Sequence, residues 1–148
     1  MTTQPSADGV FSTSRIFPFT PAQVFAAFAN GDRLATWWGP EGFSNTFEIF
    51  EFKPQGRWKF VMHGPDGKHY PNDSVFLEAA QQKIIVRHVS PPNFTLTITL
   101  TATDGQTHLD WRQAFDDPHV AASLAHIIVP ANEQNLNRLH TALLAAQT

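Results

Sequence analysis

Eight residues in the second half of the chain alternate strictly between an apolar side chain and threonine, from Phe94 to Thr101. Successive side chains of a strand point to opposite faces, so this segment has one apolar face and one polar face. A strand of this kind belongs to an antiparallel sheet that is covered on one side only. The segment from Thr107 to Phe115 repeats the pattern, and Asp104-Gly105 is a clear hairpin turn between the two.

The other segments predict the order of the elements. A first strand is expected from Val10 to Phe19, and Thr20 with Gln23 forms a capping box that starts a helix from Pro21 to Ala29. A second short helix is expected from Asp32 to Trp38, before Gly39-Pro40. Six further strands are predicted at residues 47–52, 58–63, 70–79, 83–90, 94–103 and 107–115.

Helix returns at the end of the chain. Asp117-Pro118 is a cap followed by a first-position proline, and Pro130 is expected to restart a longer helix that runs to about Ala146. Leu136, Leu139 and Leu143 form an apolar stripe on that helix, which we expect to face the sheet. Strands and helices are segregated along the chain, so the fold class is α+β.

Length, hydropathy and charge limit the number of domains, the location and the partners that we expect. The 148 residues suit one domain, with a flexible N-terminus expected at residues 1–9 and a single domain at 10–148. No apolar run approaches the roughly 18 residues of a membrane span, and the N-terminus lacks the apolar core of a signal peptide, so a cytoplasmic location is expected. The net charge is −3 with lysines and arginines scattered singly, which argues against nucleic acid and against a polybasic membrane patch.

The sequence lacks the residues or motifs of several common kinds of catalytic and metal-binding site. The chain has no cysteine, which excludes disulfides and thiolate nucleophiles. His63 and His69 flank a hairpin turn and could lie opposite each other, but no motif with the ligand spacing of a metalloenzyme is present. A Gly-x-Ser-x-Gly elbow and a glycine-rich phosphate loop are also absent. We therefore expect no metal and no cofactor.

Three segments, taken with the order of elements, carry a family resemblance. They are residues 33–40 (RLATWWGP), 56–67 (GRWKFVMHGPDG) and 136–139 (LNRL). From Phe11 to about Leu144 the chain resembles the SRPBCC superfamily, in the branch named for homologues of the heat-shock-protein-90 ATPase activator. The resemblance implies a START-like, helix-grip fold. In that fold a curved antiparallel sheet of six to seven strands surrounds a long C-terminal helix, two short helices follow the first strand, and a cavity lies between sheet and helix.

The same resemblance implies several functions. The family contains chaperone activators with a role in the stress response, carriers of hydrophobic ligands and an antibiotic-sequestering type, and the fold does not select among them. Many members have Gly-Trp near the start of the C-terminal helix, where this chain has Ala-Asn-Glu-Gln-Asn at 131–135.

The inward aromatic side chains are the main candidates for a ligand site. A filled core is the alternative, because burying a large apolar side chain stabilises a fold by about 1.5–3 kcal/mol whatever its function. His88 and Gln113 interrupt apolar faces and need hydrogen-bond partners, and adjacent residues such as Trp37 and Trp38 cannot share one helix face. The candidate ligand-binding residues are Trp37, Trp38, Trp58, Phe60, Met62, Phe76, His88, Ile98, Trp111, Gln113, Leu136 and Leu139.

Three functions stay open at this point. The leading one is binding or sequestration of a hydrophobic small molecule, by a monomer or a homodimer. A chaperone-associated module is the second, although we expect no appreciable ATPase stimulation by this chain alone, since an activator gains effective concentration from a second anchoring surface. The third is a cofactor-free cyclase or hydrolase with Glu78 or His88 as its base. Glu78 shares the parity of Phe76, so it either points inward or lies exposed at an edge. An inward Glu78 would have its pKa raised by desolvation unless a cation such as Arg87 pairs with it.

Overall fold

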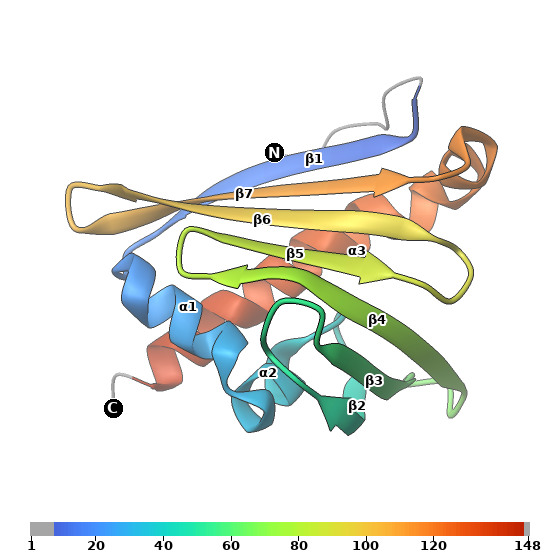
Figure 1. Cartoon of the computed structure of the whole chain (residues 1–148), viewed down its shortest axis with the longest axis horizontal. Coiled ribbons are helices and arrows are strands. Elements are labelled where there is room, and N and C mark those ends of the chain that lie inside the picture. The colour runs from blue at the N-terminus through green and yellow to red at the C-terminus, as the bar shows by residue number, and fades with distance from the viewer. Residues whose placement is uncertain (1–7, 147–148) are drawn as a thin grey trace.

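The strands of the described chain, residues 8–146, form one antiparallel sheet in this computed structural model (Figure 1). Their spatial order is β1-β7-β6-β5-β4-β3-β2. The elements are β1 (Val10–Phe17), α1 (Pro21–Ala29), α2 (Gly31–Trp37), β2 (Ser44–Phe50), β3 (Arg57–His63), β4 (His69–Ala80), β5 (Lys83–His88), β6 (Phe94–Thr103), β7 (Gln106–Phe115) and α3 (Pro118–Ala145). This order confirms the predicted α+β, helix-grip fold. The predicted flexible N-terminus falls mainly on residues 1–7, which lie outside the described residues.

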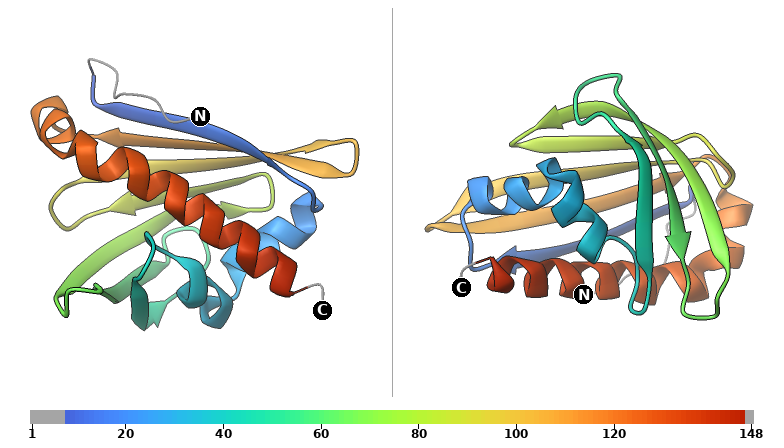
Figure 2. Two further views of the ribbon diagram at one scale, coloured as in Figure 1. Left: turned by 180° about the vertical axis from the view of Figure 1, so that it is seen from behind. Right: turned by 90° about the horizontal axis from the view of Figure 1, so that it is seen from below.

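The long helix α3 lies across the inner face of the sheet, and the sheet curves around it (Figure 2). Leu136, Leu139 and Leu143 are buried there, as their spacing predicted. Helices α1 and α2 complete the enclosure beside the C-terminal half of α3. No helix of residues 8–146 combines the length and apolarity that crossing a bilayer requires.

The prediction of a helix restart at Pro130 is wrong, because α3 is one continuous helix of 28 residues. Proline removes one backbone hydrogen bond and crowds the preceding turn, which disfavours a helix interior locally. Both halves of α3 are nevertheless held by the same sheet. Ala121 packs with Phe11 and Phe115 in one apolar cluster, and Leu136 belongs to the main core. Tertiary packing therefore outweighs the local effect of Pro130.

Strand β1 ends at Phe17, two residues before its predicted end. Pro18 has no N–H to donate to the ladder, which is why the pairing with β7 stops at Phe17. The helix that follows begins at Pro21 with both hydrogen bonds of the predicted capping box between Thr20 and Gln23.

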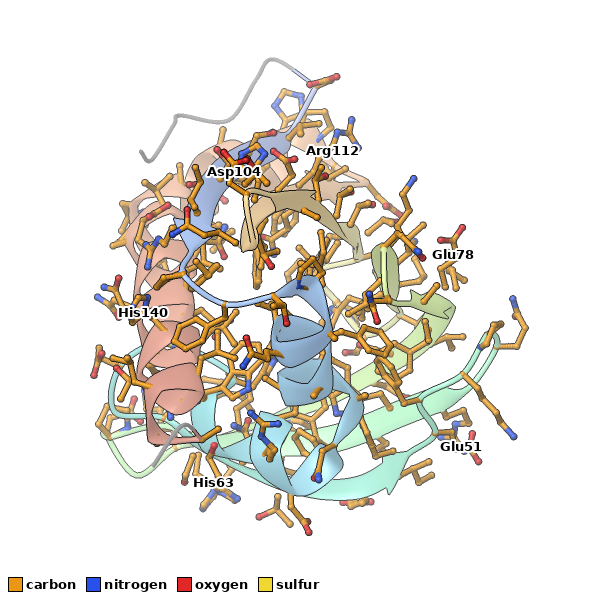
Figure 3. All side chains as sticks on the ribbon, turned by 90° about the vertical axis from the view of Figure 1, so that its left-hand side faces the viewer. Glu51, His63, Glu78, Asp104, Arg112 and His140 are labelled. Atoms are coloured by element: carbon orange, nitrogen blue, oxygen red, sulfur yellow. The ribbon has the colours of Figure 1, made fainter. Side chains whose placement is uncertain are left out.

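A β-bulge in β4 decides where Glu78 points. Phe76 pairs with Val86, whereas Glu78 pairs with Ile85, so one extra residue is inserted between the two pairs. The insertion reverses the parity, and Glu78 is exposed on the outer face of the sheet (Figure 3). The inward orientation considered for Glu78 is therefore wrong, and this carboxylate has no access to the interior.

Candidate functional site

A cavity of about 250 Å³ lies between the inner face of the sheet and α3. Its volume falls between the roughly 150 Å³ of an engineered cavity that binds benzene and the about 300–1,000 Å³ of drug-sized pockets. None of its lining residues is Asp, Glu, Lys or Arg. They are Trp38, Gly39, Pro40, Trp58, Phe60, Met62, Asn72, Ser74, Val86, His88, Pro92, Phe94, Leu96, Trp111, Gln113, Ala131, Asn132 and Asn135.

Strand pairing brings the lining residues of the sheet into rows. Leu96 lies opposite Val86 on one side and opposite Gln113 on the other. His88 lies between Ser74 and Phe94 in the next row. Side chains in one row lie on the same face of the sheet. The inward positions of β6 therefore identify the inward positions of the strands beside it.

Aromatic rings form one end of the cavity. The ring of Trp58 stacks on Phe60 at 4.5 Å between centroids and on Phe76 at 5.4 Å. Trp38 lies between the other two indoles, 5.1 Å from Trp58 and 5.8 Å from Trp111. Ring packing of this density fixes the shape of the wall, because each ring has neighbours on more than one side.

Arg138 on α3 holds the loop that closes the cavity beside Trp38. Its guanidinium donates to five backbone carbonyl oxygens at 2.9–3.2 Å, those of Thr36, Trp38, Gly39, Pro40 and Phe43. The side-chain oxygen of Asn135 also accepts the N–H of Gly39 at 3.1 Å. Gly39 has a φ of +99°, a backbone conformation that favours glycine. The LNRL segment thus contains an arginine that attaches α3 to the cavity loop.

His88 is buried in the cavity wall with both ring nitrogens engaged. Nε2 lies 2.7 Å from Oδ1 of Asn72, and Nδ1 lies 2.9 Å from the carbonyl oxygen of Pro92. The ring also stacks on Phe94 at 4.5 Å. Burial lowers the pKa of His88 below its ordinary value, while the contacts with Pro92 and Ser90 act against this shift. Because both ring nitrogens are occupied by protein oxygens, His88 has little freedom to exchange a proton with a ligand.

Two indole N–H groups of the cavity wall lack a partner. Trp58 and Trp111 are 2% and 3% exposed, and their Nε1 atoms have no hydrogen-bond acceptor among the described residues. The contrast with Trp37 is direct, since its Nε1 donates to the carbonyl of Ala27 at 3.2 Å. Gln113, the other polar residue expected inside, accepts a hydrogen bond from Asn132 at 3.1 Å.

The sequence-predicted residues divide between the cavity and the core around it. Trp37 is buried against Phe28 while its neighbour Trp38 lines the cavity, in line with the argument that they cannot share a face. The cavity-lining members are Trp38, Trp58, Phe60, Met62, His88, Trp111 and Gln113. The buried members outside the lining are Trp37, Phe76, Ile98, Leu136 and Leu139.

Sequence reasoning missed part of the lining. Asn72 and Ser74 share the phase of Phe76 in β4, and this run of polar residues on an apolar phase was the available signal. The contributions of Gly39, Pro40 and Pro92 come from loops, which alternation does not describe.

The histidines that flank the β3–β4 hairpin do meet. Nδ1 of His63 lies 2.7 Å from Nδ1 of His69, and Nε2 of His63 lies 2.7 Å from Oγ1 of Thr46; Figure 3 labels His63. Within residues 8–146, no three histidine or acidic side chains come together as a metal site would require. The expectation of no bound metal stays a prediction, which elemental analysis of the purified protein would test.

Solved structures of several bacterial proteins share this fold. A solution structure from Arthrobacter aurescens has a TM-score of 0.89 and 19% identity, covering 98% of this chain and 91% of that one. A crystal structure from Nitrosomonas europaea has a TM-score of 0.87 and 18% identity, covering 96% and 98%. A crystal structure from Rhodobacter sphaeroides has a TM-score of 0.85 and 23% identity, covering 100% and 99%.

Sequence comparison assigns the family. No curated protein matches the chain. A family model described as "Activator of Hsp90 ATPase homolog 1-like protein" matches residues 18–144, which include all three segments that carried the resemblance. The chain therefore belongs to the family of Activator of Hsp90 ATPase homolog 1-like proteins.

Proposed function

We propose that this protein binds an apolar or aromatic small molecule in the cavity between its sheet and α3, and holds it without chemical change. The observation that carries this proposal is the composition of the wall, in which three indoles and two phenyl rings surround about 250 Å³. Aromatic walls offer a planar ligand ring contacts of roughly 0.5–1.5 kcal/mol each. A cytoplasmic location forms part of the proposal and is supported by the absence of cysteine.

The chemistry of the lining favours binding over catalysis. A general base needs a titratable group within hydrogen-bond reach of the ligand. The lining contains no carboxylate, and both ring nitrogens of His88 contact protein oxygens. Glu78, the other candidate base, is exposed on the far side of the sheet.

Titration with naphthalene tests the proposal. The readout is the set of indole N–H signals in ¹H–¹⁵N NMR spectra, since the four tryptophans give one signal each. We expect saturable shifts for the three cavity indoles and little change for Trp37, which is bonded to Ala27.

A matched pair of α3 variants locates the binding. Ala131→Leu adds volume inside the cavity and should weaken naphthalene binding, whereas Ala122→Leu adds the same volume at an exposed position and should not. Equal binding by both variants, or no saturable shift in the wild type, would contradict the proposal.

The family's description supplies a second candidate function, activation of a chaperone ATPase. Purified chain would be added to an Hsp90 ATPase and turnover followed. We expect no appreciable stimulation, and a dose-dependent rise in turnover would favour this second function.

A further inference from the structure

We propose that the ligand is an uncharged aromatic compound of about two fused rings with a hydroxyl or carbonyl oxygen at each end, one bound by the hydroxyl of Ser74 and the other by the side-chain amide of Gln113. The inference rests on the proposed function and specifies the class of ligand that the cavity takes. It follows from two polar groups of the lining that have no partner in the protein, from their separation, and from the charge and volume of the cavity.

Ser74 is a polar residue on the inner face of the sheet, in the wall of the cavity. It lies on β4, paired with Trp58 on one side and with His88 on the other, and it is 1% exposed. Its hydroxyl has no hydrogen-bond partner among the described residues. Buried hydroxyls are nearly always hydrogen-bonded in native proteins, so this one needs a partner that the protein does not supply.

The hydroxyl of Ser74 is open to the cavity. Among residues 8–146, the buried polar atoms that lack a partner and are also sealed from solvent belong to Asn45, Trp58 and Trp111. Ser74 is not one of these residues, so a small molecule can touch its Oγ. Strands β3 and β5 flank β4 on its two sides, and the space over its inner face at this position is the cavity. A ligand there can accept a hydrogen bond from this hydroxyl or donate one to it.

Gln113 provides a second free group, on the other side of the cavity. Its Oε1 accepts a hydrogen bond from Asn132 on α3 at 3.1 Å, whereas its Nε2 has no acceptor among the described residues and is not sealed either. Toward the sheet edge the residue is enclosed by Phe11 on β1 and by Phe115, which are buried in one apolar cluster. The open side of the amide is therefore the cavity. Because Nε2 can only donate, it binds a ligand oxygen.

An apolar surface separates the two groups. Ser74 is on β4 and Gln113 is on β7, so three strand spacings of about 4.8 Å separate their backbones, on the order of 14 Å. The curve of the sheet around α3 brings the side-chain ends closer together (Figure 2). Between them lie Val86 on β5 and Leu96 on β6, which both line the cavity. A ligand that reaches both groups has its oxygens at opposite ends of an apolar body that lies over Val86 and Leu96.

Charge and volume define the rest of the ligand. The lining contains no Asp, Glu, Lys or Arg, and burying an ionised group without a counter-charge is strongly unfavourable. The oxygens are therefore uncharged, as in a phenol, ketone or quinone, in preference to a carboxylate. A volume of about 250 Å³ exceeds the roughly 150 Å³ that holds one benzene ring and falls short of the about 300 Å³ at which drug-sized pockets begin. Two fused rings fit between these limits.

Two isomers of naphthalenediol test the arrangement in the wild type. The 2,6-isomer has a hydroxyl at each end of the ring system, whereas the 2,3-isomer has both at one end and is otherwise matched in size and polarity. Titrations followed by the indole N–H signals give the two dissociation constants. We expect the 2,6-isomer to bind about 3- to 10-fold more tightly, the worth of one additional neutral hydrogen bond. Equal binding, or tighter binding of the 2,3-isomer, would overturn the inference.

Variants test the two residues directly. Ser74→Ala removes one hydroxyl, and Gln113→Met keeps the length of the side chain without its amide. Each should weaken binding of the 2,6-isomer by about 3- to 10-fold and change naphthalene binding by less than about 2-fold. The matched controls are Ser14→Ala and Gln106→Met, at exposed positions outside the lining, and they should leave both affinities unchanged.

The stability of Ser74→Ala separates a ligand-binding role from a structural one. Because the hydroxyl has no partner in the protein, its loss should leave the Tm of the unliganded protein within about 2 °C of the wild type. A larger decrease would show that the hydroxyl is bonded inside the fold and would overturn its assignment to the ligand. If Gln113→Met does not fold, the two isomers still decide, since Ser74→Ala should abolish the preference for the 2,6-isomer and a retained preference would count against Ser74.

The outcomes also distinguish this inference from the proposed function. If naphthalene and both diols bind and the cavity variants behave like their controls, the assignment of Ser74 and Gln113 is overturned while ligand binding stands. If none of the three compounds binds the wild type, both proposals fail. Tighter binding of naphthalene-2,6-dicarboxylate than of the 2,6-diol would overturn the assignment of an uncharged ligand.

Discussion

Replacing Arg138 tests how α3 and the cavity loop hold each other. The guanidinium is partly buried and donates to five backbone carbonyl oxygens between Thr36 and Phe43. Arg138→Lys keeps the charge and most of the apolar stem but concentrates its donors on one nitrogen. An ammonium has three N–H groups and lacks the planar fork, so it cannot serve five carbonyls spread around the loop.

The size of the effect follows from the bonds lost. A hydrogen bond to a charged group is worth about 1.5–3 kcal/mol, but bonds that share one donor group do not add. Water can also reach part of the loop and replace some of the partners. We expect Arg138→Lys to lower the free energy of unfolding by about 2–3 kcal/mol and Arg138→Ala to lower it by about 3–5 kcal/mol. For a chain of this length each kcal/mol corresponds to about 2–4 °C in Tm.

Urea unfolding followed by tryptophan fluorescence measures these changes. Arg112 is the control, since it is exposed on the outer face of β7 (Figure 3) and its replacement by lysine should change stability by less than about 0.5 kcal/mol. Naphthalene binding should weaken in Arg138→Lys as well, because the loop supplies Trp38, Gly39 and Pro40 to the cavity. An Arg138→Lys protein as stable as Arg112→Lys would refute the idea that the guanidinium organises the loop.

Three further predictions concern the wall and the helix. The pKa of His88 in the folded protein lies below its ordinary value of 6.5. The unfolded chain therefore binds more protons, and the free energy of unfolding falls as the pH drops below about 6.5. In urea titrations His88→Gln should flatten that fall, whereas His126→Gln, at an exposed position, should not. Trp111→Ala should cost less than the about 3–5 kcal/mol of a filled core, since one side of the ring borders a cavity, and a full core value would count against the cavity. Pro130→Ala should raise the free energy of unfolding by about 1–3 kcal/mol by restoring a helix hydrogen bond, and unchanged thermal unfolding would contradict this.

Alternation along strands predicted the inner face well, and its failures have local causes. Trp58, Phe60 and Trp111 lie where period-two counting placed them, because each is in an uninterrupted stretch of its strand. The alternation gives the wrong face for Glu78 because a β-bulge follows Phe76. That bulge arises from the pairing of β4 with β5, and the sequence of β4 alone contains no sign of it. The loop contacts of Arg138 escaped prediction for a similar reason, since they join segments about 100 residues apart.

The origin of the cavity lies in the sequence of α3. Along the face that meets the sheet, the helix presents Leu136, Leu139 and Leu143 over its C-terminal half, and these fill the core. Over the aromatic wall the helix instead presents Ala131 and Asn132. Small or polar side chains opposite three indoles leave volume that leucines would occupy. The same helix also anchors the loop of Trp38, Gly39 and Pro40 through Arg138. Helix α3 therefore both leaves the cavity unfilled and holds one of its walls in place.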